Sequence, residues 1–362
     1  MSWEEKVRRV VPYVAGEQPG KPGVIKLNTN ECPYPPAPGV KRLAEELDCG
    51  KLRLYPDPDA AGLTEALAEY YQVRPEQVFV GVGSDDVLAM AFLTFFNSGK
   101  PVLFPDVTYS FYDVWAQLFR IPYQVCPLDE SWRIRPEDYR KENGGVIFPN
   151  PNAPTGMYET LETVERILEA NRDVVVIVDE AYIDFGGHSA LPLLEKYDNL
   201  LIVQTFSKSR AMAGLRIGFC IGSEKLIGYL KDVKFSFNSY TMNLPAQLLG
   251  REAIRDDAYF KKTVAKIVAT RQRVKKELKS LGFSFPDSRA NFLFVTHDRI
   301  PARQLFSALR EADIYVRYWD KPRISDYLRI TVGTDEEMDA LLAFLKDYVS
   351  KADGKWPESQ GI

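Results

Sequence analysis

Residues 199–218 have the sequence NLLIVQTFSKSRAMAGLRIG, and this stretch decides the fold. Its first eight residues form an apolar run that is typical of a buried strand. Lys208 comes two residues after that run, and Arg216 follows one short glycine-containing segment later. An ammonium group at the end of a buried strand is costly unless it is paired or neutralised. The stretch therefore predicts a buried strand with a lysine just after its end, where the amine of the lysine belongs to a functional site.

Similar apolar runs surround this strand, and helical patterns separate several of them. The runs are QVFVGVG (77–83), KPVLFPD (100–106), PYQVCPL (122–128), GGVIFPN (144–150), DVVVIVDE (173–180) and RIGFCIG (216–222). The helix candidates between them are residues 85–96, 109–120 and 162–172. Strands that alternate with helices in this way are typical of a mostly parallel sheet covered by helices. We therefore expect a large α/β domain.

The pattern changes after residue 222 and predicts a smaller α+β domain. A long, basic amphipathic segment is followed by short strand and helix patterns, namely NFLFVT (291–296), PARQLFSALREA (301–312), IYVRYW (314–319), YLRITVG (327–333) and DEEMDALLAFLKDYV (335–349). The first 40 or so residues are rich in proline and glycine, which predicts an extended arm. We expect residues 1–45 to form this arm and contribute to the small domain. Residues 46–255 then form the large domain, and residues 256–362 the small one.

Composition limits the classes of function. The 362 residues are 45% hydrophobic and 27% charged, with a formal net charge of −4, which is typical of a soluble globular protein. The sequence has no long basic run, which argues against nucleic acid and anionic membranes as partners. It also lacks the apolar core of a signal peptide and any stretch near the ~18 apolar residues of a membrane span. We therefore expect a cytoplasmic protein.

Cysteine and histidine are too sparse to carry the chemistry. The four cysteines are scattered without C-x-x-C spacing, which argues against a disulfide framework and a zinc site. The two histidines, His188 and His297, lie far apart in the sequence, which argues against a histidine-based triad or a metal site. The chemistry must then rest on lysine, arginine, aspartate, tyrosine and asparagine.

Polar residues follow several strands at the edge where ligands bind in open α/β sheets. The sequence Gly83-Ser84-Asp85 opens a helix and offers N–H groups as an anion cup, although a plain turn capped by Ser84 would have the same sequence. Asp179 ends a buried strand and needs a cationic partner, unless it only caps a helix. Asn152 lies in a proline-rich loop, where its plainer role is to belong to a rigid loop. Tyr109 follows a fourth strand, where its plainer role is to pack in the core.

Lys208 indicates one function that the polar residues at the strand ends would share. A lysine in such a cleft is useful as an imine, and pyridoxal phosphate supplies the aldehyde for it. The phosphate of this cofactor binds at a helix N-terminus with an arginine, its ring nitrogen pairs with a carboxylate, and its phenolic oxygen accepts hydrogen bonds. A freed lysine serves as a general base if its neighbours lower its pKa. The set of polar residues therefore favours pyridoxal phosphate as the cofactor.

Motifs along almost the whole chain carry a resemblance to a known family. They are IKLNTNECPY (25–34), RLYPDP (53–58), Gly83-Ser84-Asp85, NPNAPTG (150–156), DEAYIDF (179–185), TFSKSRAMAGLRIG (205–218) and YLRITVGTDEE (327–337). With them the sequence resembles the fold-type I pyridoxal-phosphate aminotransferases, and within these the histidinol-phosphate aminotransferase family. One departure lies in the arm, where Cys32 stands in place of the asparagine that usually follows the equivalents of Asn30 and Glu31.

The resemblance implies how each residue would hold the cofactor. Lys208 would bind it covalently and move the proton, Asp179 would pair with the ring nitrogen, and Tyr109 would stack on the ring. Asn152 and Tyr182 would hold the phenolic oxygen. The groups expected at the phosphate are the backbone of Ser84 and Asp85, the side chains of Ser207 and Arg216, and Tyr55 from the partner subunit of a homodimer with a shared active site.

The resemblance also implies a reaction, the transfer of an amino group between L-histidinol phosphate and 2-oxoglutarate in histidine biosynthesis. Arg317 and Arg329 would clamp the substrate phosphate, with Arg323 a third candidate, although surface ion pairs are the plainer role. Asn30 and Tyr13 would line the substrate pocket. Because Arg329 alone would also hold a carboxylate, an aromatic amino-acid aminotransferase stays a second hypothesis, and a threonine-phosphate decarboxylase a third.

Overall fold

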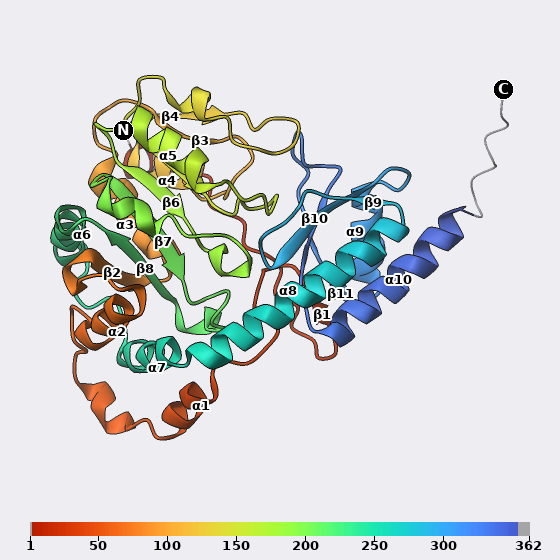
Figure 1. Ribbon diagram of the computed structural model, residues 1–362, viewed down its shortest axis with the longest axis horizontal. Coiled ribbons are helices and arrows are strands. Elements are labelled where there is room, and N and C mark those ends of the chain that lie inside the picture. Colours follow the sequence, from red (N-terminus) through yellow and green to blue (C-terminus); the bar gives the residue numbers. More distant parts are fainter. Residues whose placement is uncertain (1, 354–362) are drawn as a thin grey trace.

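The computed structural model describes residues 2–353, and its centre is a seven-stranded sheet with helices on both sides (Figure 1). The strands of this sheet are β2 (Val78–Val82), β3 (Val102–Pro105), β4 (Tyr123–Cys126), β5 (Gly145–Pro149), β6 (Val176–Asp179), β7 (Leu200–Thr205) and β8 (Ile217–Gly222). Their order across the sheet is β2-β8-β7-β6-β5-β3-β4. Only β8 runs antiparallel to its neighbours, so the other strands end at one common edge.

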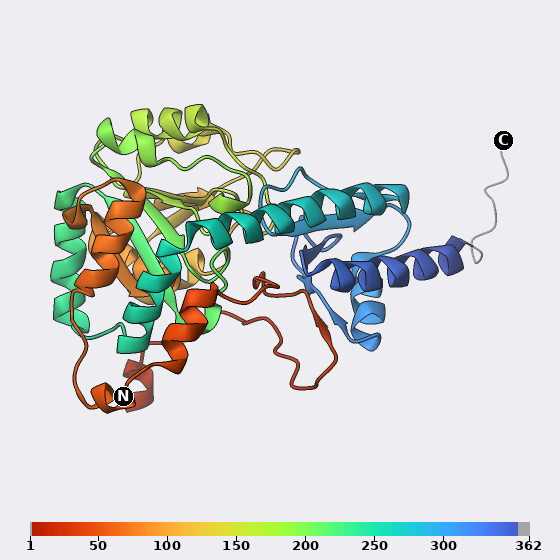
Figure 2. The ribbon, with the colours of Figure 1, turned by 60° about the horizontal axis from the view of Figure 1, so that its bottom comes forward.

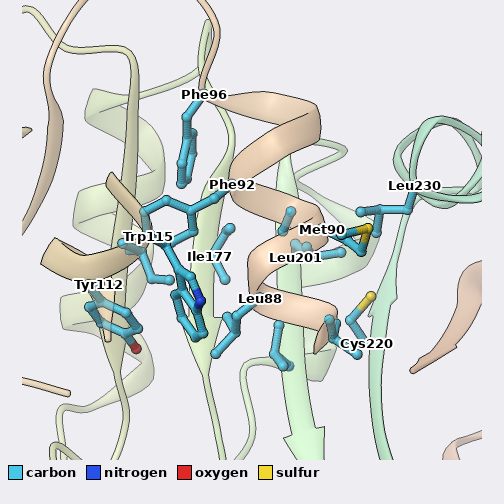
Figure 3. Close-up of a cluster of buried hydrophobic side chains, with 14 of the residues drawn as sticks. Leu88, Met90, Phe92, Phe96, Tyr112, Trp115, Ile177, Leu201, Cys220 and Leu230 are labelled. Atoms are coloured by element: carbon cyan, nitrogen blue, oxygen red, sulfur yellow. The ribbon is translucent and has the colours of Figure 1, made fainter. Parts of the chain in front are cut away.

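Alternate residues of the central strands face the two helical layers. Ile177 and Leu201 face one layer, where they pack against α3 (Ser84–Phe95), α4 (Tyr112–Phe119) and α6 (Glu224–Phe237), as Figure 3 shows. Val178 and Ile202 face the opposite layer with α5 (Leu161–Ala170). Near β2 and β8 the cover is completed by α1 (Pro38–Glu45), α2 (Ala61–Tyr71) and α7 (Leu244–Arg255). Burial on both faces explains why these strands have continuous apolar runs.

A smaller region follows, built on a four-stranded antiparallel sheet of order β12-β13-β10-β9. Its elements are α8 (Asp257–Ser280), β9 (Phe283–Ser284), β10 (Phe292–His297), α9 (Ala302–Glu311), β11 (Ile314–Tyr315), β12 (Arg317–Tyr318), β13 (Leu328–Thr331) and α10 (Asp335–Asp353). The arm reaches this region, because β1 (Ile25–Lys26) pairs with β11 in parallel. Helix α8 spans the length between the large sheet and the small one in both views (Figure 2).

Short 3-10 helices occupy several of the connections. They are η1 (Trp3–Lys6), η2 (Cys49–Arg53), η3 (Pro75–Gln77), η4 (Pro136–Tyr139), η5 (Ile183–Phe185), η6 (Leu191–Glu195) and η7 (Ala213–Leu215). Across residues 2–353, no helix combines the length and the apolar character that crossing a membrane requires.

The predicted fold class is confirmed: a large, mostly parallel sheet covered by helices, with a smaller α+β part. Each predicted run contains a strand, but IYVRYW is divided, because β11 pairs with β1 while β12 pairs with β13. Helices α2, α6 and α7 lie in segments for which we made no prediction, whereas α1 lies at the end of residues 1–45, which we expected to be an extended arm. The domain boundaries near residues 45 and 255 remain our proposal.

Candidate active site

A cavity of about 530 Å³ lies at the carboxyl edge of the large sheet, where that edge meets the small region. This volume lies in the range of pockets that bind cofactors and small ligands. Most of the residues predicted for the site line it, namely Tyr13, Asn30, Ser84, Asp85, Tyr109, Asp179, Tyr182, Ser207, Lys208, Arg216, Arg317 and Arg329. Asn152 lies just behind the lining, next to Ala153, and Tyr55 lies elsewhere on the surface.

The turn between β2 and α3 has the geometry of an anion cup. Gly83 has a left-handed φ of 85° and is the N-cap of α3, so Ser84 is the first helical residue rather than the predicted cap. No side chain caps this helix end, and the nearby Asp86 carboxylate instead accepts a hydrogen bond from Val82 N at 2.9 Å. The N–H groups of Ser84 and Asp85 have no intrahelical acceptor, which leaves them for an anion.

Strand β8 and the residues before it complete this cup. Arg216 Nη2 donates to Asp85 Oδ2 at 3.1 Å, and Arg216 Nη1 donates to Ser207 Oγ at 3.3 Å. Gly218 lies directly under the turn, because a Cβ on it would be 2.2 Å from Gly83 C and Ser84 N. Only glycine lets the strand pass this close, so the cup is held against β8 with a guanidinium at its rim.

Asp179 presents its carboxylate at the end of β6, 4% exposed. Its Oδ2 accepts from the Tyr112 hydroxyl at 2.9 Å, and its Oδ1 accepts from Ala181 N at 3.2 Å. Burial raises the pKa of Asp179 to about 6, although both hydrogen bonds oppose this rise. A cationic nitrogen beside the carboxylate would supply the charge partner that this burial calls for.

Lys208 lies in the loop after β7, where it faces the cavity. Its Nζ donates to the carbonyl oxygen of Thr29 at 3.0 Å and lies 5.8 Å from the centre of the Tyr182 ring. Burial lowers the pKa of Lys208 to about 8, and Arg329 contributes next to this decrease. About a tenth of this amine is therefore neutral, and nucleophilic, at pH 7.

Tyr109 and Asn152 approach the cavity from the large domain. The Tyr109 hydroxyl donates to Asp85 Oδ1 at 2.7 Å, which ties its ring to the cup. Asn152 Nδ2 donates to Val107 O and to Thr155 Oγ1, both at 3.0 Å. The buried Asn152 Oδ1 has no hydrogen-bond partner among residues 2–353. A buried acceptor of this kind is normally paired by a water molecule or by a bound group.

Asn30 and Tyr182 meet where the arm, the large sheet and the small sheet come together. Asn30 is 1% exposed, with a left-handed φ of 56°, and its Nδ2 donates to the Tyr182 hydroxyl at 3.0 Å. Asn291 Nδ2 donates to the carbonyl oxygen of Asn30 at 3.0 Å. Asn30, predicted to bind substrate, thus has its amide engaged with a second residue of the site.

Arg317 and Arg329 face each other on neighbouring strands, as register partners in the β12–β13 ladder. Arg317 donates to the carbonyl oxygens of Val14 and Ala15, and Arg329 donates to that of Asn28 at 2.9 Å. Burial lowers the pKa of Arg329, which Arg317 lowers further. Among residues 2–353, no carboxylate pairs with either guanidinium, so the two arginines form a cationic end of the cavity.

Tyr13 and Trp319 border this cationic end. Tyr13 stacks on Phe111 with ring centres 4.1 Å apart, which holds the arm against the large domain. The guanidinium groups of Arg317 and Arg329 lie 5.3 Å and 5.1 Å from the ring of Trp319. Trp319 was not among the predicted site residues, yet IYVRYW contained the signal, because alternate residues such as 317 and 319 share one face of a strand.

Arg323 also lines the cavity but is already paired, and Tyr55 lies outside the cavity. Arg323 forms an ion pair with Asp106 and donates to Leu128 O at 3.0 Å, so its guanidinium joins the small region to the large one. Tyr55 is 82% exposed and stacks on Tyr240, with ring centres 4.6 Å apart. Arg323 is therefore occupied, and Tyr55 is presented outward from its own subunit.

Tyr112 and Thr331 are further residues that the sequence prediction missed. Tyr112 is fully buried in the aromatic cluster of Figure 3, and its hydroxyl contacts Asp179. Thr331 is 2% exposed and contacts Asn30. Tyr112 is the first residue of α4, and Thr331 is the last residue of the antiparallel strand β13. A hydroxyl at either position does not show in the sequence which residue it will contact.

These residues fit pyridoxal phosphate. The cup offers free N–H groups, Arg216 and Ser207 for the phosphate, and Asp179 offers a buried carboxylate for the ring nitrogen. Lys208 offers an amine with a lowered pKa for the aldehyde. The unpartnered Oδ1 of Asn152 and the close approach at Gly218 are the marks of a site shaped for a bound group.

Comparison with known proteins agrees with this geometry. Residues 22–345 match the family model described as aminotransferase class I and II. The chain belongs to the aminotransferase class I and II family. This membership confirms the predicted enzyme class, a transaminase that depends on pyridoxal phosphate.

Curated members of the family are similar to the chain over nearly its whole length. A histidinol-phosphate aminotransferase of Lactococcus lactis subsp. cremoris (strain MG1363) is 52% identical over 349 residues, which cover 96% of this chain and 98% of that protein. One of Chromohalobacter salexigens is 50% identical, with coverage of 95% and 98%. This level of identity confirms the predicted resemblance to histidinol-phosphate aminotransferases.

Solved structures of the family share the fold. The histidinol-phosphate aminotransferase of Sinorhizobium meliloti, in complex with pyridoxal-5'-phosphate, has a TM-score of 0.83 at 25% identity, covering 91% of each chain. That of Clostridium acetobutylicum has a TM-score of 0.84 at 22% identity, covering 91% of this chain and all of the other.

Proposed function

We propose that this aminotransferase moves an amino group between L-histidinol phosphate and 2-oxoglutarate, as a step of histidine biosynthesis. The pair Arg317 and Arg329 in the cavity carries this proposal. L-Histidinol phosphate has a phosphate and no carboxylate, and two guanidinium groups supply forked donors for such a dianion. The name shared by relatives that are 52% and 50% identical supports the same donor.

The other two reactions use the arginine pair less well. An aromatic amino acid brings one carboxylate, which a single arginine binds, so the second guanidinium would stay unneutralised beside the first. Threonine phosphate brings a phosphate but also a carboxylate that must be lost as carbon dioxide. We therefore rank both below the transamination of histidinol phosphate.

The proposed chemistry begins at Lys208. When bound, pyridoxal phosphate supplies an aldehyde for the amine and a ring that accepts the negative charge left by proton loss. With the cofactor bound, the Lys208 amine would hold its aldehyde group, and once the substrate amine has freed it, the same amine would serve as the base for the proton on the substrate carbon. The pKa of about 8 suits both tasks, because the amine gains and loses a proton near physiological pH.

The other side chains hold the reacting parts in place. Asp179, fixed by Tyr112, keeps a positive charge on the ring nitrogen, and Tyr109 covers the ring. The α3 cup with Ser207 and Arg216 anchors the cofactor phosphate. Tyr182 would hold the phenolic oxygen, whereas both N–H bonds of Asn152, which was expected to hold it as well, are engaged within the chain. Arg317 and Arg329 fix the substrate phosphate, and Tyr13 of the arm covers the pocket and limits its access to water.

We further propose a homodimer with a shared active site. Tyr55 stacks on Tyr240, and the side chains of Leu52, Leu54 and Phe237, which lie close to one or the other in the sequence, are exposed as well. A patch of this kind on a globular protein indicates a protein–protein interface. In the proposed assembly, Tyr55 of the partner subunit reaches the phosphate of the cofactor, so each site needs both copies.

The proposal is tested by the visible spectrum of the purified protein with added L-histidinol phosphate and no keto acid. We expect the absorption of the lysine-bound cofactor to disappear and that of its amine form to replace it, because half of the transamination needs no acceptor. Adding 2-oxoglutarate should restore the first band.

Parallel samples distinguish the alternatives. A spectrum that responds to phenylalanine or tyrosine but not to L-histidinol phosphate would identify an aromatic amino-acid aminotransferase. Release of carbon dioxide from phosphothreonine without a keto acid would identify the decarboxylase. If the protein shows the cofactor band but responds to none of these amines, the assignment of the cofactor stands and L-histidinol phosphate is not the amino donor.

A further inference from the structure

A chain of buried hydrogen bonds connects the small sheet to Tyr182. The backbone N–H of Asn30 donates to Thr331 Oγ1 at 3.0 Å, and the Thr331 hydroxyl donates to Asn30 Oδ1 at 3.1 Å. Asn30 Nδ2 then donates to the Tyr182 hydroxyl at 3.0 Å. All three residues are buried. Among residues 2–353, Asn30 is the single hydrogen-bond partner of the Tyr182 hydroxyl.

The direction of each bond in this chain is determined by the first one. A backbone N–H can only donate, so Thr331 Oγ1 accepts from it and keeps its own proton for another acceptor. Within the described residues, Asn30 Oδ1 is the acceptor that this proton has. If the Asn30 amide were turned over, the buried Thr331 hydroxyl would lose its acceptor, which is unfavourable. The amide must therefore direct Nδ2 toward Tyr182.

We propose that Thr331 and Asn30 are positioning residues that set the direction of the Tyr182 hydroxyl proton. Because the Tyr182 oxygen accepts from Asn30, its proton is left to point away from Asn30 and into the cavity. This inference rests on the proposed function only in placing the phenolic oxygen of the cofactor beside Tyr182. It then follows that Tyr182 donates a hydrogen bond to that oxygen.

The hydrogen bonds of Asn152 make the Tyr182 hydroxyl more important as a donor. Both N–H bonds of the Asn152 amide are engaged, with Val107 O and Thr155 Oγ1, and its free atom is the acceptor Oδ1. In this arrangement Asn152 has no donor to offer. Tyr182 is then the residue that supplies the hydrogen bond to the phenolic oxygen.

The direction of the proton has a measurable consequence. A hydrogen bond donated to the phenolic oxygen favours its anionic form and disfavours a proton on the neighbouring nitrogen that joins Lys208 to the cofactor. Losing that bond should raise the pKa of this nitrogen. The charged and titratable groups that face Lys208 and Tyr182 from the packed elements are Tyr13, Glu31, Asp85, Tyr109, Asp179, Arg216, Arg317 and Arg329. The test variants leave all of them in place.

The test is a pH titration of the visible absorption of the holoenzyme without substrate. Tyr182→Phe removes the hydroxyl, and we expect the midpoint to rise by about one to two pH units, the usual effect of a hydrogen bond to a charged group. Thr331→Val should raise the midpoint in the same direction, since it frees the Asn30 amide to turn over. Thr331→Ser keeps the hydroxyl and should retain the wild-type midpoint.

The double variant Thr331→Val/Tyr182→Phe separates a positioning role from a general disturbance of the site. If Thr331 acts through Tyr182, the double variant shifts the midpoint no further than Tyr182→Phe alone. Additive shifts, or a Thr331→Val midpoint equal to the wild type, would overturn the inference. So would an unshifted midpoint in Tyr182→Phe. Since no amine substrate is added, a failure of the histidinol-phosphate proposal would leave this titration readable.

Discussion

Lys208 lies against the cavity wall, and burial lowers the pKa of its amine from 10.5 to about 8. Only the neutral amine attacks an aldehyde, and about a tenth of it is neutral at pH 7 with this pKa. We predict that the rate at which the apoprotein captures pyridoxal phosphate rises about tenfold per pH unit below pH 8 and levels off above it. Stopped-flow absorbance between pH 6 and pH 9.5 measures this profile.

Lys208→Ala is the control for that profile. It should capture no cofactor covalently at any pH and should have no turnover, while its circular dichroism stays that of the wild type. A capture rate that still rises steeply above pH 9 would show that the amine has its ordinary pKa and that burial does not determine its reactivity.

The guanidinium groups near the mouth of the cavity differ in the partners that they already have within the chain. Within residues 2–353, Arg317 donates its hydrogen bonds to carbonyl oxygens of the arm and has no carboxylate partner, whereas Arg323 is paired with Asp106. We predict that Arg317→Ala raises the KM for L-histidinol phosphate by about 10- to 100-fold, because a charge-assisted hydrogen bond is lost. The KM for phenylalanine should change far less.

Arg323→Ala serves as the matched variant for this comparison. It removes the same group from the same region, but it breaks a contact between the two domains, so we expect it to affect both amines by the same factor. Steady-state kinetics with the two donors decide the matter. Equal effects of Arg317→Ala on both donors would contradict the phosphate clamp.

Individual residues show where sequence reasoning about the site succeeds and where it fails. Lys208 and Asp179 could be predicted, because a charge at the end of an apolar run is unusual and a parallel sheet gathers such ends. Thr331 and Tyr112 could not, because their roles depend on which residue lies opposite after folding. A hydroxyl in an ordinary strand or helix gives no sign of its future partner.

The element that most constrains the cofactor phosphate is the β2–α3 turn packed on β8. A Cβ at position 218 would overlap backbone atoms of Gly83 and Ser84, which cannot move without opening the cup. We predict that Gly218→Ala weakens the binding of pyridoxal phosphate by about tenfold or more, the usual scale of overpacking. Equilibrium dialysis or a fluorescence titration of the apoprotein measures the dissociation constant.

Gly214→Ala provides the comparison within the same motif. Gly214 lies four residues upstream in η7, and a Cβ there would meet no heavy atom within 4 Å. This variant should bind the cofactor like the wild type. Equal losses in the two variants would mean that the glycines of the segment act through chain flexibility and not through the space under the cup.

A helix or strand could be predicted where the pattern of its own residues determines it. Every strand of the large sheet lies within a predicted apolar run. Most of these strands are buried on both faces and so need continuous apolar residues, whereas the edge strand β4 is buried only at Cys126. The start of α3 was misplaced by one residue, because Gly83, with its left-handed φ, takes the cap position that Ser84 was expected to hold. The division of residues 314–319 between two strand partners depends on tertiary contacts and had no local signal.

On the scale of the whole molecule, the site is assembled from parts that are distant in sequence. The arm contributes Tyr13 and Asn30, the large sheet contributes Asp179 and Lys208, and the small sheet contributes Arg329. The sequence motifs predicted this set of residues, but they did not predict how the parts are joined. The joints are contacts such as Asn30 with Thr331 and Arg323 with Asp106, which exist only in the folded chain.

The exposed position of Tyr55 leads to a prediction about the assembly. If Tyr55 of the partner subunit binds the cofactor phosphate, a site needs Lys208 from one copy and Tyr55 from the other. Heterodimers that combine one Tyr55→Ala subunit with one Lys208→Ala subunit should then contain one intact site. We predict about half the wild-type turnover per dimer, since a two-fold dimer has two equivalent sites. Two affinity tags allow this species to be purified and assayed.

The complementary heterodimer places both substitutions on one subunit beside a wild-type partner. A shared site predicts low turnover here, because the intact Lys208 then faces the altered position 55 of the other chain. A site built within one subunit predicts the reverse: half of the wild-type turnover in this heterodimer and only the residual level in the first. Since both species contain the same substitutions in the same numbers, losses of stability affect them equally. The order of their activities therefore reports only on which chain supplies Tyr55.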